Sequence, residues 1–273
     1  FGIHGTVLVT YESGGEEVTD ILVPTVYTHT LIEANFNGLE GKITIQRGEE
    51  TSNSMPFKQM APSISNLCGN DGDNPQFETP GGEPLTITVN DIGKEMSAVS
   101  VSVGGANCSM VSLVPLSVGT VSLSQCSGGI EVTEDMDIAE VTCRVPEGQG
   151  IDKDVVISRL GQSSRSGVSI DYRPPTVTAV SPKLVPTTGH VWVYITGTNL
   201  GRRSVLAFLD NSATFGECEF VTNHTEVRCR APPGEGTAKP FGPLEVYEDD
   251  ISASQKWHNP GLSSGITVSY FRP

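Results

Sequence analysis

The stretch TTGHVWVYITGTNLG, residues 187–201, decides the fold of this chain. Inside it, Val191, Val193 and Ile195 alternate with bulky residues that include Trp192. A period of two is typical of a β-strand with one face buried and the other face toward solvent. We therefore predict a strand whose aliphatic side chains fill a core and whose Trp192 side chain lies on the outer face.

The same alternation recurs along the whole chain, and the expected fold class is all-β. Stretches with helical spacing are short and are broken by Gly or Pro, so no helix is predicted. Two segments, 104–138 and 231–260, are predicted to be long loops. Further strands are expected at 6–11, 42–46, 85–89, 98–103, 139–143, 155–157, 226–229, 244–247 and 266–271.

An internal repeat organises these strands. GGEPLTITVNDIG at 81–93 parallels TGHVWVYITGTNLG at 188–201, and AEVTCRVPEGQG at 139–150 parallels TEVRCRAPPGEG at 225–236. The repeat predicts two complete β-sandwich units, which are preceded by the C-terminal part of another because the pattern begins partway through a unit at Phe1. The predicted boundaries are 1–60, 61–173 and 174–273.

Proline stands at both predicted joints, Ala61-Pro62 and Pro174-Pro175. Proline fixes its own φ and restricts the residue before it. The joints have almost no linker, so we expect the units to form a rod-like array.

Charge excludes one class of partner. The net charge is −15, divided as 3 − 8 = −5 for residues 1–60, 6 − 15 = −9 for 61–173 and 8 − 9 = −1 for 174–273. Nucleic-acid binding rests on Lys and Arg that neutralise phosphates, and this chain lacks that basic footprint. No apolar run is long enough to insert into a membrane, so we expect neither nucleic acid nor direct membrane insertion.

The cysteines indicate an oxidising compartment. Their number is even and none forms a C-x2-C pair, which disfavours a zinc site and favours disulfides. Disulfides place a chain in the secretory pathway, outside the cell or on its surface. The six are Cys68, Cys108, Cys126, Cys143, Cys218 and Cys229.

The C-terminal unit resembles an IPT/TIG domain, an immunoglobulin-like fold found in receptor stalks and in some transcription factors. The resemblance lies in PTVTAVSP at 175–182, in the Gly–strand–Gly–Asn-Φ-Gly order of 187–201, and in the paired cysteines with a Pro-Pro turn at 218–236. Residues 61–173 are similar in the same order, with an insertion between Cys108 and Cys143. The resemblance therefore implies tandem immunoglobulin-like sandwiches of an extracellular protein.

The resemblance also implies a disulfide pairing. Cys218 would join Cys229, and the equivalent pair in the preceding unit would be Cys108 with Cys143. Cys68 and Cys126 would then tie the insertion to the first strand. The rival arrangement, Cys126–Cys143 with Cys68–Cys108, stays open.

Candidate modification and ligand sites are few. Asn107 and Asn223 begin Asn-X-Ser/Thr glycosylation sequences. Asp71 and Asp73, two residues apart in an acidic loop, are candidate calcium ligands. Trp192 and Trp257, the two tryptophans, are candidate interface anchors.

We expect no cofactor and no catalytic residue. The sequence GLSSG at 261–265 fits the G-x-S-x-G pattern of hydrolases, but that motif needs a strand-to-helix turn in an α/β sheet. The histidines are scattered singly, without the spacing of a helical zinc site. A solvated loop is the simpler interpretation of 261–265.

These features favour a non-enzymatic stalk, adhesion or recognition segment of a cell-surface or secreted protein. It would bind a protein partner or itself through sandwich faces or loops. One alternative is a structural subunit of an extracellular coat or filament. Another, of a different class, is an accessory module of a secreted carbohydrate-active enzyme, which the scarcity of tryptophan disfavours.

Overall fold

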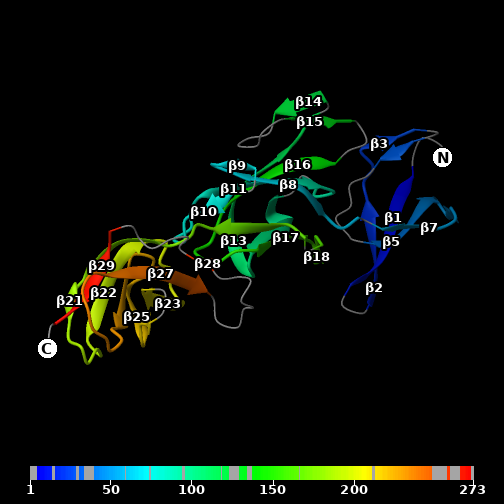
Figure 1. Ribbon diagram of the computed structural model, residues 1–273. Helices are drawn as coiled ribbons and strands as arrows, with labels where there is room; N and C mark the ends of the chain where they lie inside the picture. The colour runs from blue at the N-terminus through cyan, green and yellow to red at the C-terminus, as the bar shows by residue number, and fades with distance from the viewer. Residues whose placement is uncertain are drawn as a thin grey trace. The chain divides into compact units, whose positions relative to one another are not determined.

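The computed structural model shows a chain built almost entirely of β-strands, which divides into two compact units (Figure 1). The first unit holds residues 1–61 with 160–162, and the second holds 62–159 with 163–273. The structure describes residues 5–13, 16–28, 31–33, 40–58, 60–73, 75–93, 96–117, 119–122, 129–133, 137–165, 167–210, 213–247, 257–258 and 265–271.

The first unit is a five-stranded antiparallel sheet with a separate two-stranded pair. The main sheet has the order β2-β1-β5-β6, and β7 also pairs with β5. Val7 lies between Leu22 and Ile45 in the register, so apolar side chains meet across three strands. The strands are β1 (Thr6–Ser13), β2 (Glu16–Leu22), β3 (Val26–Tyr27), β4 (Ile32–Glu33), β5 (Glu40–Arg47), β6 (Glu50–Thr51) and β7 (Met55–Lys58).

The second unit begins with a β-sandwich that we call the middle sandwich. Its strands follow the order β10-β19-β17-β12-β13-β16-β11-β8-β9, and β18 pairs with β17. They are β8 (Ser63–Gly69), β9 (Gly72–Asp73), β10 (Gln76–Phe77), β11 (Pro84–Asn90), β12 (Val99–Val103), β13 (Ala106–Pro115), β16 (Ile138–Arg144), β17 (Lys153–Arg159), β18 (Gln162–Ser163) and β19 (Ser169–Tyr172). A single 3₁₀ turn, Met96–Ala98, precedes β12.

Inward-facing side chains from the two layers of the middle sandwich form one core. Ile87 of β11, Val141 of β16 and Ile157 of β17 are fully buried in it. They sit at alternate positions of their strands, which is why period-two sequences fold into this architecture.

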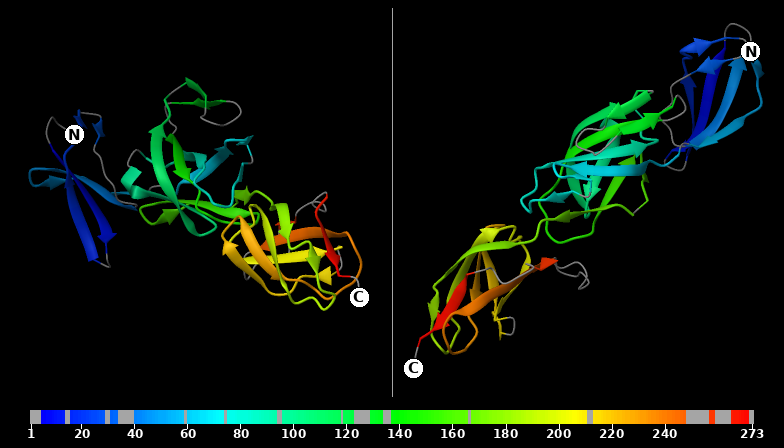
Figure 2. Two further views of the ribbon diagram at one scale, coloured as in Figure 1. Left: turned by 90° about the vertical axis from the view of Figure 1, so that its left-hand side faces the viewer. Right: turned by 45° about the horizontal axis from the view of Figure 1, so that its top comes forward.

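The predicted loop at 104–138 is instead largely strand. β13 covers 106–115, and β14 (Gly119–Ser122) with β15 (Gly129–Val132) forms a hairpin. Figures 1 and 2 show this hairpin projecting from the ends of β13 and β16. The prediction was wrong because a register shift between Met110 and Ser112 interrupts the alternation by which a strand is recognised.

The C-terminal sandwich packs two sheets, with the orders β20-β22-β26-β25 and β21-β29-β27-β23-β24 (Figure 2). β28 pairs with β27. The strands are β20 (Thr176–Ser181), β21 (Leu184–Val185), β22 (Trp192–Thr198), β23 (Ser204–Leu209), β24 (Ala213–Thr214), β25 (Cys218–Thr222), β26 (Glu226–Arg230), β27 (Lys239–Tyr247), β28 (Trp257–His258) and β29 (Thr267–Tyr270).

The predicted loop at 231–260 is also partly wrong, because β27 begins at Lys239. Two prolines and a glycine lie in the first half of that strand, and these residues usually mark turns. Between Ala207 and Leu209 of the neighbouring β23, the register shifts by a bulge that accommodates this irregular stretch.

Each sandwich repeats one set of backbone and tyrosine contacts. The Tyr172 hydroxyl donates to the carbonyl of Pro146 at 2.8 Å, and the Tyr270 hydroxyl donates to that of Pro232 at 3.0 Å. A Cβ on Gly148 would lie 2.3 Å from the Tyr172 ring, so glycine is required where the ring crosses the turn.

The fold class is that of tandem immunoglobulin-like sandwiches.

Candidate interaction site

The outer face of the sheet β20-β22-β26-β25 gathers aromatic and guanidinium side chains. Val193 and Ile195 of β22 are fully buried, so the side chains that alternate with them, including Trp192 and Tyr194, point outward. Trp192 is half-buried there, and Tyr194 is 38% exposed. The predicted outer position of Trp192 is confirmed.

Cross-strand register places an arginine opposite each aromatic residue. Trp192 faces Arg230 and Tyr194 faces Arg228 in the β22–β26 ladder. The Arg230 guanidinium carbon lies 3.8 Å from the centroid of the Trp192 ring, and that of Arg228 lies 4.6 Å away. Cation–π contacts of this kind contribute roughly 0.5–2 kcal/mol. We call Trp192, Tyr194, Arg228 and Arg230 the aromatic–arginine face.

Further hydrogen bonds fix the arginines in place. Arg228 Nε donates to Glu219 Oε2 at 2.8 Å, and Arg230 Nη1 donates to the carbonyl of His190 at 2.9 Å. The hydrogen bond to Glu219, followed by that to Tyr194, raises the pKa of the Arg228 guanidinium. The face is therefore pre-organised, which lowers the entropy lost when a partner binds.

The structure contains two of the disulfides that the family resemblance implies. Cys108 of β13 bonds Cys143 of β16, and Cys218 of β25 bonds Cys229 of β26. Cys68 is buried and disulfide-bonded. Cys126, its expected partner, lies outside the described residues.

The two candidate glycosylation residues are both exposed. Asn223 lies in the turn between β25 and β26, where an attached glycan would not interrupt the pairing of the two strands. Asn107 lies within β13, next to the disulfide-bonded Cys108.

The calcium candidates lie in the β8–β9 hairpin. The carboxylate of Asp71 accepts a hydrogen bond from Arg173 at 2.6 Å, and Arg173 also lies 3.4 Å from Glu78. Asp73 belongs to β9, and its side chain is outside the described part of the structure. A guanidinium at Asp71 competes with a cation for the same oxygens.

Trp257 belongs to β28 and pairs with Val246 in the register, but its side chain is not among those described. Residues 261–264 of the Gly-x-Ser-x-Gly sequence are outside the described ranges as well. Within the ranges that are described, no helix is long and apolar enough to cross a bilayer.

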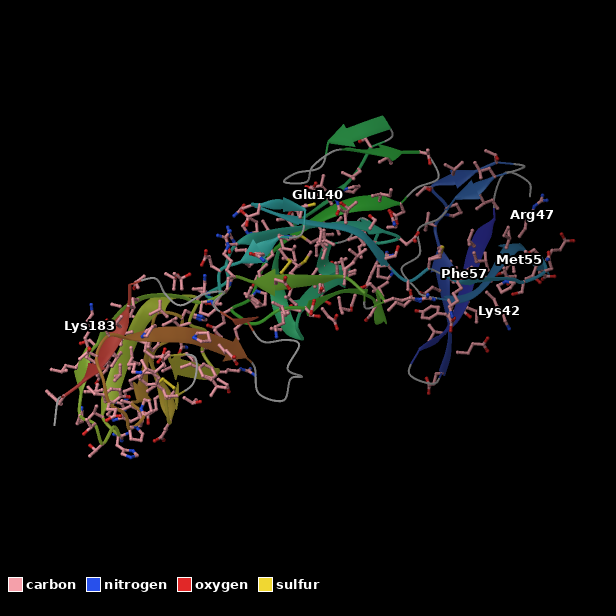
Figure 3. All side chains as sticks on the ribbon, viewed as in Figure 1. Lys42, Arg47, Met55, Phe57, Glu140 and Lys183 are labelled. Carbon is pink, nitrogen blue, oxygen red and sulfur yellow. A yellow bond between two sulfur atoms is a disulfide. The ribbon has the colours of Figure 1, made fainter. Side chains whose placement is uncertain are left out.

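The first unit has a groove that sequence reasoning missed. It has a volume of about 630 Å³ and lies against β1, β2, β5 and β7. Figure 3 labels two of its lining residues, Lys42 and Phe57. Lys58 there pairs with Glu40 at 3.0 Å. A hydrogen bond to Asp20 raises the pKa of the nearby Tyr11. The lining residues come from four strands, so no single stretch of sequence marks the groove: Thr10, Tyr11, Glu17, Glu40, Gly41, Lys42, Pro56, Phe57 and Lys58.

The sandwich architecture defines an immunoglobulin-like β protein. Residues 175–264 match the family model described as IPT/TIG domain. No curated protein matches the sequence.

Several solved structures are similar over most of the chain. The Plexin A4 extracellular region is 14% identical, with 94% of this chain and 30% of that chain covered and a TM-score of 0.29. SGBP-B from a xyloglucan utilization locus in Bacteroides uniformis is 14% identical, with 75% and 49% covered and a TM-score of 0.25. The Escherichia coli adhesin FdeC is 12% identical, with 98% and 82% covered and a TM-score of 0.29.

The chain spans less than a third of the Plexin A4 chain and about half of the SGBP-B chain.

Proposed function

We propose that this chain is a non-enzymatic extracellular segment that serves in adhesion or recognition through protein–protein contacts. The observation that carries the proposal is the aromatic–arginine face, which presents Tyr194 and two fixed guanidinium groups on a sheet. Tyr, Trp and Arg are the residues most enriched in the energetically dominant parts of protein interfaces. Disulfides at Cys143 and Cys229 support an oxidising location.

The proposed organisation has IPT/TIG-like units at 61–173 and 174–273, and the C-terminal part of a preceding unit at 1–60. The matching tyrosine hydroxyl bonds of Tyr172 and Tyr270 support two units of one kind. We also propose that Asn223 is glycosylated, because its side chain is exposed in a turn. Production in a secretory host should give a mass that falls after amidase treatment, and Asn223→Gln should remove that change.

The test of function is a binding screen of the full chain against an array of cell-surface and secreted proteins. We expect saturable binding that Trp192→Ala weakens at least tenfold, since interface hot spots contribute about 2 kcal/mol or more. Leu184→Ala is the matched control, because Leu184 is an exposed apolar residue on the opposite sheet.

Other outcomes favour the other functions. Saturable protein binding that Trp192→Ala leaves unchanged would show that the binding site does not lie on the aromatic–arginine face. Concentration-dependent assembly in sedimentation, without a partner protein, would favour a coat or filament subunit. Binding to a glycan array alone would favour the accessory module of a carbohydrate-active enzyme.

A further inference from the structure

The two sandwiches of the second unit meet through buried polar contacts between loops of the middle sandwich and a turn of the C-terminal one. The amide of Thr79 donates to Asn199 Oδ1 at 2.9 Å. The amides of Arg202 and Arg203 donate to Gln149 Oε1 at 2.6 and 3.2 Å. Thr79 and Gln149 are each 1% exposed, so these bonds are shielded from water. We call this set of contacts the junction.

The C-terminal sandwich enters the junction with its Asn-Φ-Gly turn, and it contributes mainly backbone groups. Gly201, the glycine of this turn, has a φ of 77°, and a Cβ there would collide with Gln149 Oε1. Glycine therefore lets the glutamine oxygen approach the turn. The two amides that bind this oxygen belong to the main chain, so any sandwich with the same turn can supply them.

The loop that carries Thr79 has a counterpart in the C-terminal sandwich. The amide of Gly148 donates to the carbonyl of Thr79 at 2.9 Å, and the amide of Gly234 donates to the carbonyl of Thr187 at 2.9 Å. Each threonine stands two residues before a glycine of positive φ in the turn that leads to the next strand. Thr187 therefore holds the place in the C-terminal sandwich that Thr79 holds in the middle one.

The loop that carries Gln149 is repeated in the same way. The carbonyls of Gly150 and Gly236 each accept a hydrogen bond from the amide of the buried tyrosine of their own sandwich, at 3.0 and 2.9 Å. These two glycines directly follow Gln149 and Glu235 in the sequence. Glu235 therefore holds the place of Gln149, and it presents a carboxylate where the middle sandwich presents an amide.

The two counterparts are accessible, whereas the residues that they match are buried. Thr187 is half-buried and Glu235 is exposed, against 1% exposure at Thr79 and at Gln149. A carboxylate oxygen accepts hydrogen bonds as the glutamine oxygen does, and its charge makes bonds from backbone amides shorter and stronger. The C-terminal sandwich thus carries a second, uncovered copy of the surface with which the middle sandwich holds its neighbour.

One part of the junction is not repeated. Arg202 donates to Glu147 Oε1, and His224 Nε2 lies 3.4 Å from Glu147 Oε2. Pro233 stands at the position of Glu147 in the C-terminal sandwich, and it has no carboxylate. A partner of the second surface therefore needs the turn, but it needs no basic side chain beside it.

We propose that Thr187 and Glu235 form a docking surface for a further immunoglobulin-like sandwich that presents an Asn-Φ-Gly turn. The Thr187 amide donates to the asparagine side chain of that turn, as the Thr79 amide does to Asn199. The Glu235 carboxylate accepts from the two amides that follow the glycine of the turn. The surface shares no residue with the aromatic–arginine face, so either proposal can fail without the other.

A second copy of the whole chain does not fit this surface. Its Asn199 turn is already occupied by its own middle sandwich. The matching turn of the middle sandwich is Asp91-Ile92-Gly93, in which Asp91 has a φ of 60°. The Asp91 carboxylate would be brought close to that of Glu235, and like charges repel. The surface therefore selects a sandwich whose turn begins with the neutral asparagine.

Extending the full chain after Pro273 by a second copy of residues 175–273 tests the proposal. The extension repeats the Arg-Pro-Pro sequence of the existing joint and brings an Asn-Φ-Gly turn to the surface. Glu235→Ala in the original C-terminal sandwich should lower the calorimetric unfolding midpoint by about 3 °C or more. The same substitution in the appended sandwich is the matched control and should leave the midpoint unchanged, because no turn covers that carboxylate. Equal shifts from the two positions, or no shift from either, would overturn the proposal.

The appended turn provides a second test. Asn199→Gly confined to the appended sandwich removes the acceptor of the Thr187 amide, and it should lower the midpoint by a similar amount. Asp210→Gly in the same sandwich, at an exposed position of positive φ, is the control and should change the midpoint little. Equal midpoints for these two variants would contradict the assigned contact.

Sedimentation of the chain without the extension tests the choice of partner. We expect no concentration-dependent association that depends on Glu235. Association that Glu235→Ala abolishes would assign the surface to a second copy of the chain, and would overturn the proposal of a separate sandwich.

Discussion

Tyr270 shows, at the residue scale, how the burial of one side chain makes the stability of the fold depend on pH. Its hydroxyl donates to the carbonyl of Pro232, and burial raises its pKa. The folded chain therefore holds this proton more tightly than the unfolded chain. The stabilisation is complete below the unfolded pKa of about 10 and is lost as the pH rises through the higher folded pKa.

We expect the unfolding free energy of the C-terminal sandwich to decline above about pH 10. Tryptophan fluorescence in urea measures it selectively, because both tryptophans, Trp192 and Trp257, belong to this part of the chain. Tyr270→Phe should cost about 1 kcal/mol at neutral pH and should flatten the alkaline decline. Tyr194→Phe, at an exposed position, should keep the decline.

Trp192 shows what one residue's neighbours in sequence can and cannot predict. Alternation with Val193 placed its ring on the outer face, because a strand turns successive side chains to opposite sides. The arginines above the ring could not be predicted in this way. They depend on the register between β22 and β26, which the intervening turn and the pairing with β25 determine.

The disulfides act at the scale of strand pairs. Cys108–Cys143 closes a sequence separation of 35 residues and Cys218–Cys229 one of 11. In the chain-entropy description, removing them costs about 4 and about 3 kcal/mol respectively. The double variant Cys218→Ala/Cys229→Ala should lower the fluorescence-detected unfolding free energy by about 3 kcal/mol.

The other pair is the control for that measurement. Cys108→Ala/Cys143→Ala should lower the stability of the middle sandwich, which is measured by hydrogen exchange of the Val155 amide. It should leave the unfolding transition that tryptophan fluorescence detects unchanged. An equal loss in both sandwiches from either variant would show that the two unfold together.

Sequence patterns predicted most strands but misjudged the elements that contain irregularities. β13 and β27 each lie beside a register shift, and β27 contains prolines that usually exclude a central strand. Periodicity is a local signal, whereas a bulge is stabilised by the neighbouring strand. The two predicted loops, 104–138 and 231–260, were therefore predicted to be longer than they are.

At the scale of the whole molecule, Asn199 carries a contact that no local pattern contains. It belongs to the predicted Asn-Φ-Gly turn, yet its partner Thr79 lies 120 residues away in the sequence. Asn199 has a φ of 55°, so Asn199→Gly keeps the turn and removes only the acceptor.

The loss leaves the buried Thr79 amide without that acceptor, which costs about 1–3 kcal/mol. Calorimetry of the full chain should show an unfolding midpoint lowered by about 5 °C or more. Asp210→Gly, at another positive-φ position that is exposed, should change the midpoint little. Equal shifts of the unfolding midpoint in the two variants would show that the contact between Asn199 and Thr79 does not contribute more to stability than an exposed residue does.

The parallel strand pairs of the two sandwiches have a mechanical consequence. β10 runs parallel to β19, and β21 runs parallel to β29, so an early and a late strand of each sandwich lie side by side in one direction. Tension that reaches such a pair from opposite ends of the sandwich pulls the strands along their axes in opposite senses. Their hydrogen bonds are then loaded together in shear instead of opening one by one. A chain that holds two surfaces together would resist pulling at these pairs.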